Sequence, residues 1–239
     1  MTENLFDDFW EASSLDSYGA RDYAAALSAY KSDDKETALA YPEASVPLPR
    51  PRSRLGTLAE SRRSSRAFTG GAVSADDIGA VLASLRAVAG PERRTYASAG
   101  ASYPIETFVV EFAAGSKAGA VSYYDAVGHG LAPLKRQAPS WSEAWTSLGF
   151  TSENAPAVLI LGVVFPRRVT AKYGARGERF ALIEAGSMLQ MLGLALAERG
   201  SLAGLALGGV YDRHWLGVLG LRASMARIAF GYLVGPRAK

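Results

Sequence analysis

The sequence predicts an α+β fold in which a mainly antiparallel sheet is wrapped by helices. Several short runs of β-branched and aromatic residues follow one another, and two of them are joined by only four residues, which is typical of a hairpin. A long segment, residues 177–199, is apolar nearly all round, as expected of a helix that is buried on every side. The chain of 239 residues, 49% of them hydrophobic, suffices for one large domain, alone or with an extension.

The first part of the chain is predicted to be an arm outside the main domain. Residues 1–40 are expected to form short polar or amphipathic helices, one of them over residues 22–30. The prolines of residues 47–51 then exclude a helix and predict an extended connector. We therefore expect a helical arm and connector over residues 1–54, and the main domain over residues 55–239.

Two helices are predicted at the start of the main domain. The first covers residues 57–62. The second runs over residues 74–89, with Ser74 as its N-cap and two aspartates in its first turn, where they complement the helix dipole. Its apolar residues recur at helical spacing and predict one buried face: Ile78, Val81, Leu82 and Leu85.

The remaining elements alternate between strands and helices. Strands are predicted over residues 107–113, 120–124, 157–165, 202–207 and 226–234. Residues 114–117 between the first two are expected to form a hairpin turn. The long helix over residues 177–199 ends at Gly200, a typical C′ residue, and another helix covers residues 212–219. Because the long helix is apolar on all sides, we expect a central helix that a second subunit can share.

The composition excludes several classes of protein and site. With no cysteine, the chain has no disulfide framework, no thiolate nucleophile and no cysteine-ligated metal. Mean hydropathy is +0.03, and no apolar run reaches the roughly 18–20 residues that span a bilayer. The first ten residues carry acids in place of a basic and apolar signal segment. We expect a cytoplasmic protein that does not contact a membrane.

The net charge of +3 hides an asymmetry along the chain. Residues 1–49 hold ten acidic and three basic residues, a net charge of −7, which leaves +10 on residues 50–239. Of the 26 basic residues, 20 are arginines, whose forked guanidinium suits phosphate and carboxylate groups. A pI of about 9.1 also fits a nucleic-acid binder, but no helix-turn-helix, zinc knuckle or aromatic RNA motif is recognisable. We favour a basic surface with a small anionic ligand, and expect no nucleic acid.

The segment Arg62-Arg63-Ser64-Ser65-Arg66 concentrates three guanidinium groups and two hydroxyls within five residues. Such a cluster can bind a phosphate or another concentrated anion, because arginine forks match its geometry. The alternative, which the run in isolation favours, is a solvated basic turn after a helix. Arg50, Arg52 and Arg54 fit either interpretation.

Two segments rich in small residues are further candidates for a binding site. The stretch Ser98-Ala99-Gly100-Ala101-Ser102-Tyr103-Pro104 lets backbone approach a planar ligand and offers hydroxyls and amides to its edge. Alone, it is an ordinary loop. The stretch Leu207-Gly208-Gly209-Val210 joins a strand to a helix, where a glycine pair permits close backbone approach but equally serves a tight turn.

Taken in order, these three motifs resemble the nitroreductase family over about residues 55–235. The resemblance implies a nitroreductase-like fold and an intertwined, obligate homodimer with two FMN sites at the interface. It assigns the FMN phosphate, ribityl chain and pyrimidine edge to Arg62, Arg63, Ser64 and Arg66. It places Ser98, Ala99, Gly100 and Ser102 beside the flavin of the partner subunit, and Gly208 and Gly209 along the isoalloxazine near N5.

Three features resemble the SagB-type (McbC-like) azoline dehydrogenase branch of that family, which acts on thiazoline and oxazoline rings in ribosomal peptides. One is the phrase Phe9-Trp10-Glu11-Ala12-Ser13 before the proline-rich connector. Another is Tyr123-Tyr124-Asp125 with Gly128-His129-Gly130-Leu131, which the resemblance makes a hairpin. The most specific is Lys172-Tyr173, followed by Arg176 and Arg179, since ordinary nitroreductases lack this pair. The resemblance implies oxidation of the rings to thiazoles or oxazoles, with dioxygen as the electron acceptor.

Lys172 and Tyr173 have a chemical task in such a reaction. Aromatising an azoline removes a proton from the α carbon and a hydride equivalent from the β carbon, so a base must take the proton. A tyrosine beside an ammonium group can be that base, and so can a partly desolvated lysine. The sequence leaves the choice open. Without the family resemblance, Lys172 would be a surface cation and Tyr173 a packing residue.

Other positions mark smaller expectations and departures from the family pattern. His129 is expected to be a structural hairpin residue and His214 a cap or surface residue, and no metal site is expected. Ala101 stands where nitroreductases commonly have asparagine, which leaves a backbone contact to the flavin. The C-terminus lacks their basic phosphate pair; Arg237 can substitute, although disorder is expected in the last residues.

Three functions stay open at the level of the sequence, and we favour the first. It is an FMN-dependent azoline dehydrogenase that acts on a modified peptide. Because the chain is short for such an enzyme, leader recognition is expected from a cyclodehydratase or another leader-binding partner. The second is a general NAD(P)H-dependent nitroreductase or quinone reductase, which differs in its need for nicotinamide. The third is a non-catalytic scaffold subunit of a peptide-modifying complex, which a colourless protein that binds a cyclodehydratase would indicate.

Overall fold

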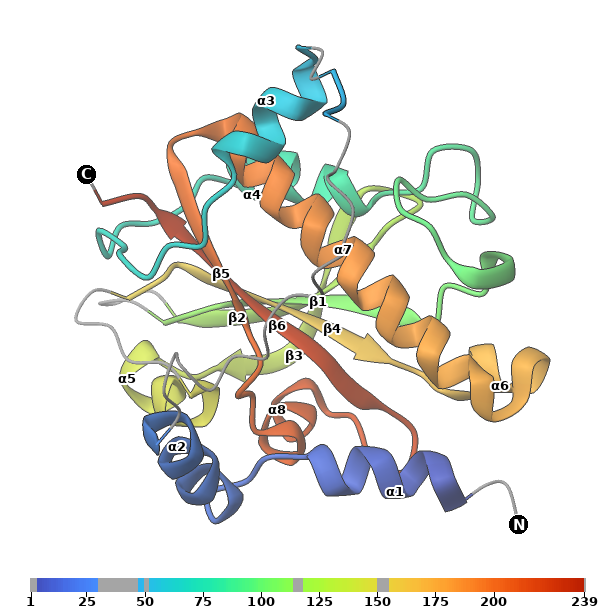
Figure 1. Cartoon of the computed structure of the whole chain (residues 1–239). Helices are drawn as coiled ribbons and strands as arrows, with labels where there is room; N and C mark the ends of the chain where they lie inside the picture. The colour runs from blue at the N-terminus through green and yellow to red at the C-terminus, as the bar shows by residue number, and fades with distance from the viewer. Residues whose placement is uncertain (1–3, 30–46, 50–51, 114–117, 150–154, 239) are drawn as a thin grey trace.

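The computed structural model describes residues 4–29, 47–49, 52–113, 118–149 and 155–238. At its centre is a six-stranded sheet in the order β3-β2-β1-β4-β6-β5, and all neighbouring strands are antiparallel (Figure 1). The strands are β1 (Ile105–Glu111), β2 (Gly119–Asp125), β3 (Gly130–Ala138), β4 (Val158–Val164), β5 (Leu202–Leu207) and β6 (Arg227–Pro236). The predicted α+β fold with an antiparallel sheet is confirmed.

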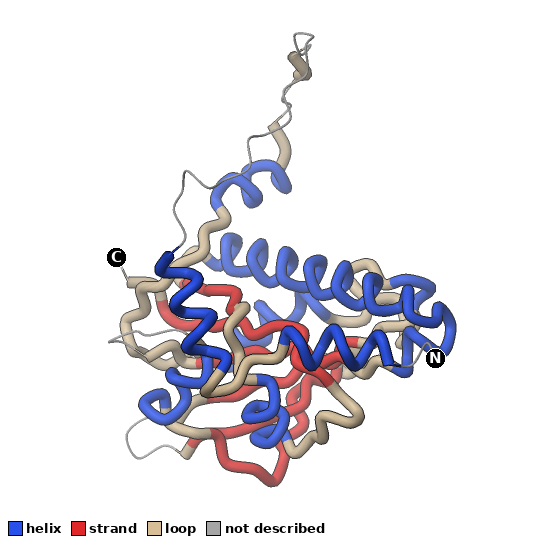
Figure 2. The backbone as a smooth tube through the Cα atoms, turned by 60° about the horizontal axis from the view of Figure 1, so that its bottom comes forward, coloured by secondary structure: helices blue, strands red, loops and turns tan. Residues whose placement is uncertain are grey.

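Helices cover both faces of this sheet. On one face lie α4 (Ala75–Leu82) and the long α7 (Gly177–Arg199), and α3 (Arg54–Ser61) packs on α7 without a buried residue of its own. On the other face lie α1 (Asn4–Ser13), α5 (Trp141–Ala144) and α8 (Asp212–Leu219) (Figure 1). Figure 2 shows α7 running along one side of the strands. The other α-helices of the described residues are α2 (Gly19–Ala29) and α6 (Arg167–Tyr173), and one 3₁₀ turn, Gly174–Arg176, joins α6 to α7.

Strand β1 shows how the two faces are filled. Ile105 and Val109 belong to the core cluster that includes α4 and α7 residues, whereas Phe108 and Val110 belong to the cluster on the side of α5 and α8. This alternation is the period of two of a strand. Because both faces are covered, nearly every residue of β1 and β4 is buried, which explains why β4 is a continuous apolar run. Strand β1 is buried as well, although it carries Glu106 and Thr107.

Element bounds were predicted best where the sequence pattern is longest or most sharply ended. Helices α7 and α8 and strand β5 have the predicted bounds. The helix predicted over residues 74–89 is shorter: α4 ends at Leu82 and one 3₁₀ turn follows, after which the Ala87 amide bonds the Ala126 carbonyl at 2.7 Å. Helix α3 starts before residue 57, because the Ser53 hydroxyl accepts the Gly56 amide and caps the helix.

Three elements were not predicted from local patterns, although the resemblance had placed the start of one of them, β3, in a hairpin with β2, as the structure has it. Strand β3 carries a proline and two basic residues and is almost entirely exposed at the sheet edge, where such residues are common. Helices α5 and α6 have four and seven residues, too few for a clear helical period. The expected C-terminal disorder is wrong, because the Arg237 amide donates to the Ser201 carbonyl at 3.0 Å. The predicted hairpin turn at residues 114–117 lies outside the described residues, as does most of the predicted connector.

The described part of the N-terminal arm packs at the start of α8. Trp10 is buried, and the Leu15 amide donates to the Asp212 carboxylate at 3.2 Å. Glu11 forms an ion pair with Arg213 at 2.7 Å. Helix α2, in contrast, has no buried residue. The arm therefore rests against the end of the main domain where β5 passes into α8, while the predicted domain boundary stays a prediction.

Helix α7 also has the length and composition of a membrane-spanning segment. An 18-residue window within Arg167–Arg199 has a mean hydropathy of 1.6. The expectation that no segment is long and apolar enough was therefore wrong. In the structure, 39% of this window is buried, and Glu184 of α7 lies in the interior. We interpret α7 as the helix that covers one face of the sheet. The expectation that it is buried on every side does not hold within one chain, because Leu182 and Ile183 on its outer side are exposed.

Candidate functional site

The cationic segment (residues 62–66) follows α3 and lies between α7 and the edge strand β5. The Ser65 amide donates to the Gly204 carbonyl of β5 at 2.9 Å. The stem of Arg62 packs on Gly193 of α7, where an added Cβ would stand 3.1 Å from Arg62 Cδ. Arg62 is half-buried, and Arg63, Ser64 and Arg66 are exposed. Among the described residues, no carboxylate forms an ion pair with these three arginines, so their charge is free for an anion.

Two residues near the C-terminus border the cationic segment. Burial raises the pKa of Tyr232 on β6 to about 12, and the nearby charge of Arg62 acts in the opposite direction. Arg237 is held beside the segment because it forms an antiparallel bridge with Phe68, two residues after Arg66. The exposed Arg237 side chain can therefore add a fourth guanidinium group to this region.

The glycine turn (Gly208 and Gly209) follows the end of β5. Gly208 is exposed, and no heavy atom lies within 4 Å of a Cβ added to it, so its backbone is open to a ligand. Gly209 packs on Gly149, whose Cα would lie 3.5 Å from an added Cβ. Gly204, which holds the cationic segment, and Gly208 are four positions apart along one extended chain, or about 13 Å. The cationic segment and the glycine turn thus line the same edge of the sheet.

The serine loop (residues 98–104) has an unusual backbone. The φ angles of Gly100, Ala101 and Tyr103 are +56°, +53° and +39°, in the left-handed region that only glycine adopts without strain. The loop is closed by its own side chain, since the Ser98 hydroxyl accepts the Tyr103 amide at 2.9 Å. A loop with two strained non-glycine residues must be held by its surroundings.

Lys172 and Tyr173 at the end of α6 contact this loop. Lys172 Nζ lies 3.4 Å from the Gly100 carbonyl and 5.3 Å from the centre of the Tyr173 ring. A Cβ added to Gly100 would overlap both the Tyr173 hydroxyl and the Lys172 ammonium group. The Tyr173 ring also packs edge-on against Phe180 of α7 at 4.9 Å between centroids. The structure therefore brings together an ammonium, a phenol and the predicted flavin-lining loop.

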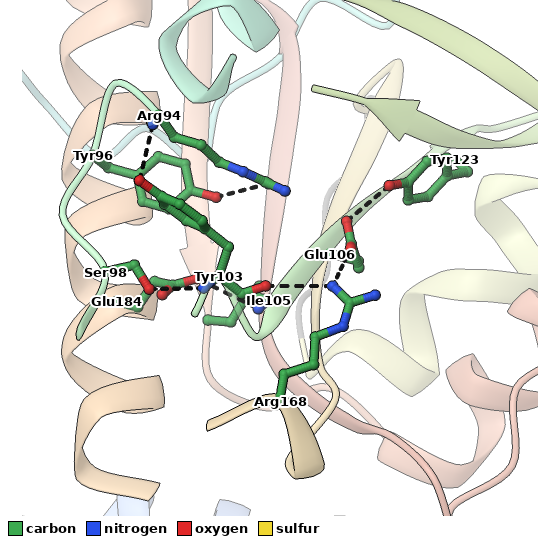
Figure 3. Close-up of polar contacts among 9 residues, drawn as sticks. All are labelled: Arg94, Tyr96, Ser98, Tyr103, Ile105, Glu106, Tyr123, Arg168 and Glu184. Atoms are coloured by element: carbon green, nitrogen blue, oxygen red, sulfur yellow. Dashed lines mark hydrogen bonds and ion pairs between the residues drawn. The ribbon is translucent and has the colours of Figure 1, made fainter. Parts of the chain in front are cut away.

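A buried carboxylate that the sequence did not single out lies behind the serine loop (Figure 3). Glu184 of α7 is 1% exposed, and its Oε1 accepts the Ile105 amide at 3.4 Å. Burial raises the pKa of Glu184 to about 7, while hydrogen bonds from the Ser98 hydroxyl and the Ile105 amide act in the opposite direction. The only signal in the sequence was the interruption of the apolar run of α7 by a glutamate.

The predicted site residues form two groups within one chain. Lys172, Tyr173 and the serine loop lie near Phe180 of α7, and the cationic segment lies at Gly193 of the same helix. These two positions are 13 residues apart, or about 20 Å along the helix axis. The outer side of α7 between the groups exposes apolar residues, with Leu182 at 41% and Ile183 at 64%.

The two histidines have the expected surroundings. His129 Nδ1 lies 2.8 Å from the Tyr124 hydroxyl in the β2–β3 hairpin, which agrees with a structural role. His214 is on the exposed side of α8, and partial burial lowers its pKa. Within the described part of the chain, no group of three or more potential ligands is placed to hold a metal ion.

Comparison with known proteins agrees with this architecture. The model of the Nitroreductase family matches residues 59–235. A chain of the E. coli microcin synthetase McbBCD complex, with truncated pro-MccB17 bound, has a similar structure with a TM-score of 0.74. The identity is 21%, and the match covers 99% of this chain and 93% of that one. A search of curated proteins finds no match.

Two putative nitroreductases are also similar in structure. The protein from Ralstonia eutropha JMP134 has a TM-score of 0.64 at 21% identity, with 80% of this chain and 89% of that one covered. The protein from Desulfovibrio desulfuricans, solved in complex with FMN, has a TM-score of 0.50 at 16% identity, with 79% and 89% covered. At these low sequence identities, the structural similarity supports the fold alone.

Proposed function

Since its residues 59–235 match the family model, the chain belongs to the nitroreductase family, and we propose that it is an FMN-dependent dehydrogenase of azoline rings in a peptide. The observation that carries this proposal is the contact of Lys172 and Tyr173 with Gly100, in the loop that the resemblance places beside the flavin. The similar chain of the McbBCD complex supports it, because that complex is a synthetase solved with pro-MccB17 bound.

The residues present fit an FMN molecule. The cationic segment offers guanidinium groups with no described carboxylate partner, and we assign the phosphate and ribityl end to Arg62, Arg63, Ser64 and Arg66. Arg237 adds a charge beside them. At the other end of β5, the open backbone of Gly208 suits the edge of a planar ring. When bound, FMN supplies the acceptor for the hydride equivalent, and dioxygen is the proposed final acceptor.

The chain's own residues would handle the proton. The azoline ring loses a proton from its α carbon, and the base must lie within hydrogen-bond reach of it. Lys172 is exposed and Tyr173 half-buried, so both can approach a substrate at the serine loop. We propose that the pair acts together, with one residue as the base and the other as its polar neighbour. Both groups lie against the backbone of Gly100.

A homodimer would complete the site. The two groups of site residues are separated by about 20 Å along α7 in one chain, so the serine loop of one subunit would serve the cationic segment of the other. The exposed apolar residues Leu182 and Ile183 on α7 support this arrangement, because a second copy would cover them. Ser98, Ala99, Gly100 and Ser102 would then line the flavin bound by the partner.

The substrate and further partners follow from the same proposal. We propose a modified peptide as substrate, with a cyclodehydratase or leader-binding protein as partner, as the likeness to a synthetase complex suggests. We also propose a cytoplasmic location. A general NAD(P)H-dependent nitroreductase is the second candidate, favoured by the similar fold of the Ralstonia eutropha protein.

Two measurements test the proposal. The purified protein should bind FMN and show a flavin absorption spectrum, and it should remove two hydrogens from an azoline-containing peptide under air without nicotinamide. Lys172→Ala and Tyr173→Phe should each keep FMN and lose at least about tenfold in turnover, as expected for an acid–base group. Full turnover in both variants would exclude the pair as the base. Nitroaromatic reduction that requires NAD(P)H, with no azoline oxidation, would favour the second candidate.

A further inference from the structure

A second buried carboxylate, Glu106 of β1, lies close to the serine loop and α6. It is 6% exposed and forms an ion pair with Arg168 of α6. The Tyr123 hydroxyl donates to the same carboxylate at 2.9 Å (Figure 3). Burial, and then the charge of Glu106, raises the pKa of Tyr123 to about 12, so Tyr123 stays a donor. With two partners, the carboxylate has a fixed orientation toward Arg168.

Arg168 also reaches the serine loop. The same guanidinium nitrogen that contacts Glu106 lies 3.4 Å from the Tyr103 carbonyl. On the other side of Tyr103, its amide donates to the Ser98 hydroxyl, and its φ angle is +39°. One guanidinium group therefore touches the sheet through Glu106 and the strained loop through Tyr103.

The position of Arg168 on α6 explains why its contacts with Glu106 and Tyr103 matter for Lys172. Arg168 precedes Lys172 by four residues, which is about one helical turn, so the two side chains lie on the same face. Lys172 itself makes only a 3.4 Å contact with the Gly100 carbonyl, at the weak end of hydrogen bonding. The buried Val169 packs α6 into the core. Among the polar contacts of α6, the charged pair of Arg168 with Glu106 is stronger than the contact of Lys172 with Gly100.

We propose that Arg168 is a positioning residue that joins Glu106 to the Tyr103 carbonyl and so holds Lys172 and Tyr173 against the serine loop. The proposal rests on the proposed function, because the position of this pair affects turnover only if the pair acts on the substrate. Arg168 is not expected to contact substrate or FMN.

The test compares Arg168→Met, which keeps the length of the stem, with Arg168→Lys, which keeps the charge but lacks the fork. Arg167→Met is the matched control, since Arg167 is the neighbouring arginine on α6 and is exposed like Arg168, but is not paired with Glu106. On an azoline peptide, Arg168→Met should lower kcat about tenfold or more, as small displacements of reacting groups do. KM and FMN affinity should stay within about twofold, and Arg168→Lys should recover part of kcat.

Hydrogen exchange provides a readout that does not depend on activity. Arg168→Met should accelerate exchange in the serine loop and in α6, while β4 and β6 keep their protection. Exchange like that of Arg167→Met would overturn the proposal, and so would a uniform loss of protection across the sheet, which would mark a general folding role. If the wild-type protein oxidises no azoline peptide, the proposed function fails, and the exchange data still decide on Arg168.

Discussion

The cationic segment and the end of α6 hold their functional side chains in opposite ways. In the cationic segment, Arg63 and Arg66 are exposed, and no ion pair with a carboxylate is described for either. Around the serine loop, the carboxylates of Glu184 and Glu106 are 1% and 6% exposed and are bonded to the backbone or to charged neighbours. The cationic segment thus leaves its positive charges unpaired, whereas the carboxylates around the serine loop hold the backbone and the neighbouring side chains in place.

This difference agrees with the two proposed tasks. A site for an anion must keep its positive charge unpaired until the ligand arrives. A site that moves a proton must hold its groups within about half an ångström of the productive geometry. This requires that surrounding residues pack against these groups and hydrogen-bond to them. We therefore expect damage to the cationic segment to change FMN affinity. Damage around the serine loop should change turnover and the pH dependence of stability.

The largest effect is expected from pH, and it should arise at Glu184. Burial raises its pKa from 4.5 to about 7. The charge of Glu106 acts in the same direction, and Ser98, Ile105 and Arg94 oppose it. At a pH between 4.5 and about 7, the folded chain keeps Glu184 protonated and therefore binds more protons than the unfolded chain. The stability that the protonated Glu184 contributes is thus fully present below pH 4.5 and is lost as the pH rises through about 7.

A shift of this size corresponds to roughly 3 kcal/mol in the free energy of unfolding. Denaturant unfolding of the wild type and Glu184→Gln, both loaded with FMN, would measure it between about pH 5 and 8. The wild type should lose about 2 kcal/mol or more relative to the variant over this range. Burial also raises the pKa of Asp212 to about 6. Because Asp212 titrates in both proteins, its effect on stability cancels in the comparison. Parallel pH profiles would contradict the expected role of Glu184.

The next largest effect is expected at Arg62. Arg62→Met keeps the stem that packs on Gly193 and removes the guanidinium group. A hydrogen bond to a charged group is worth roughly 1.5–3 kcal/mol, so FMN should bind about 10- to 100-fold more weakly. Fluorescence titration would measure this, and turnover at saturating FMN should stay within about twofold. Arg21→Met, an exposed arginine of α2, is the control; equal FMN affinity in the two variants would contradict the assignment.

The two regions also differ in how far the sequence could predict them. Helices α7 and α8 and strand β5 have strong local patterns, so their bounds were predicted correctly. The cationic segment is a contiguous run that the sequence shows directly, and its role stays a prediction. Lys172 and Tyr173 were found only through resemblance. The supporting network has no local signal, because Arg168 and Glu106 are 62 positions apart, and Glu184 and Ile105 are 79 apart. Such pairs meet only after α6 and α7 have packed on the sheet.

The smallest effect is expected at Gly100, and it separates backbone strain from contact with the proposed base. Gly100→Ala adds a Cβ at a φ of +56°, where it overlaps the Tyr173 hydroxyl and the Lys172 ammonium group. Gly90→Ala is the matched control, since Gly90 has a φ of +68° and nothing within 4 Å of an added Cβ. Both variants carry the left-handed penalty of about 1–2 kcal/mol in stability. Only Gly100→Ala should also lower azoline turnover, by about tenfold, because only it displaces the pair. Equal turnover in the two variants would mean that the contact of Gly100 with Lys172 and Tyr173 is unimportant for catalysis.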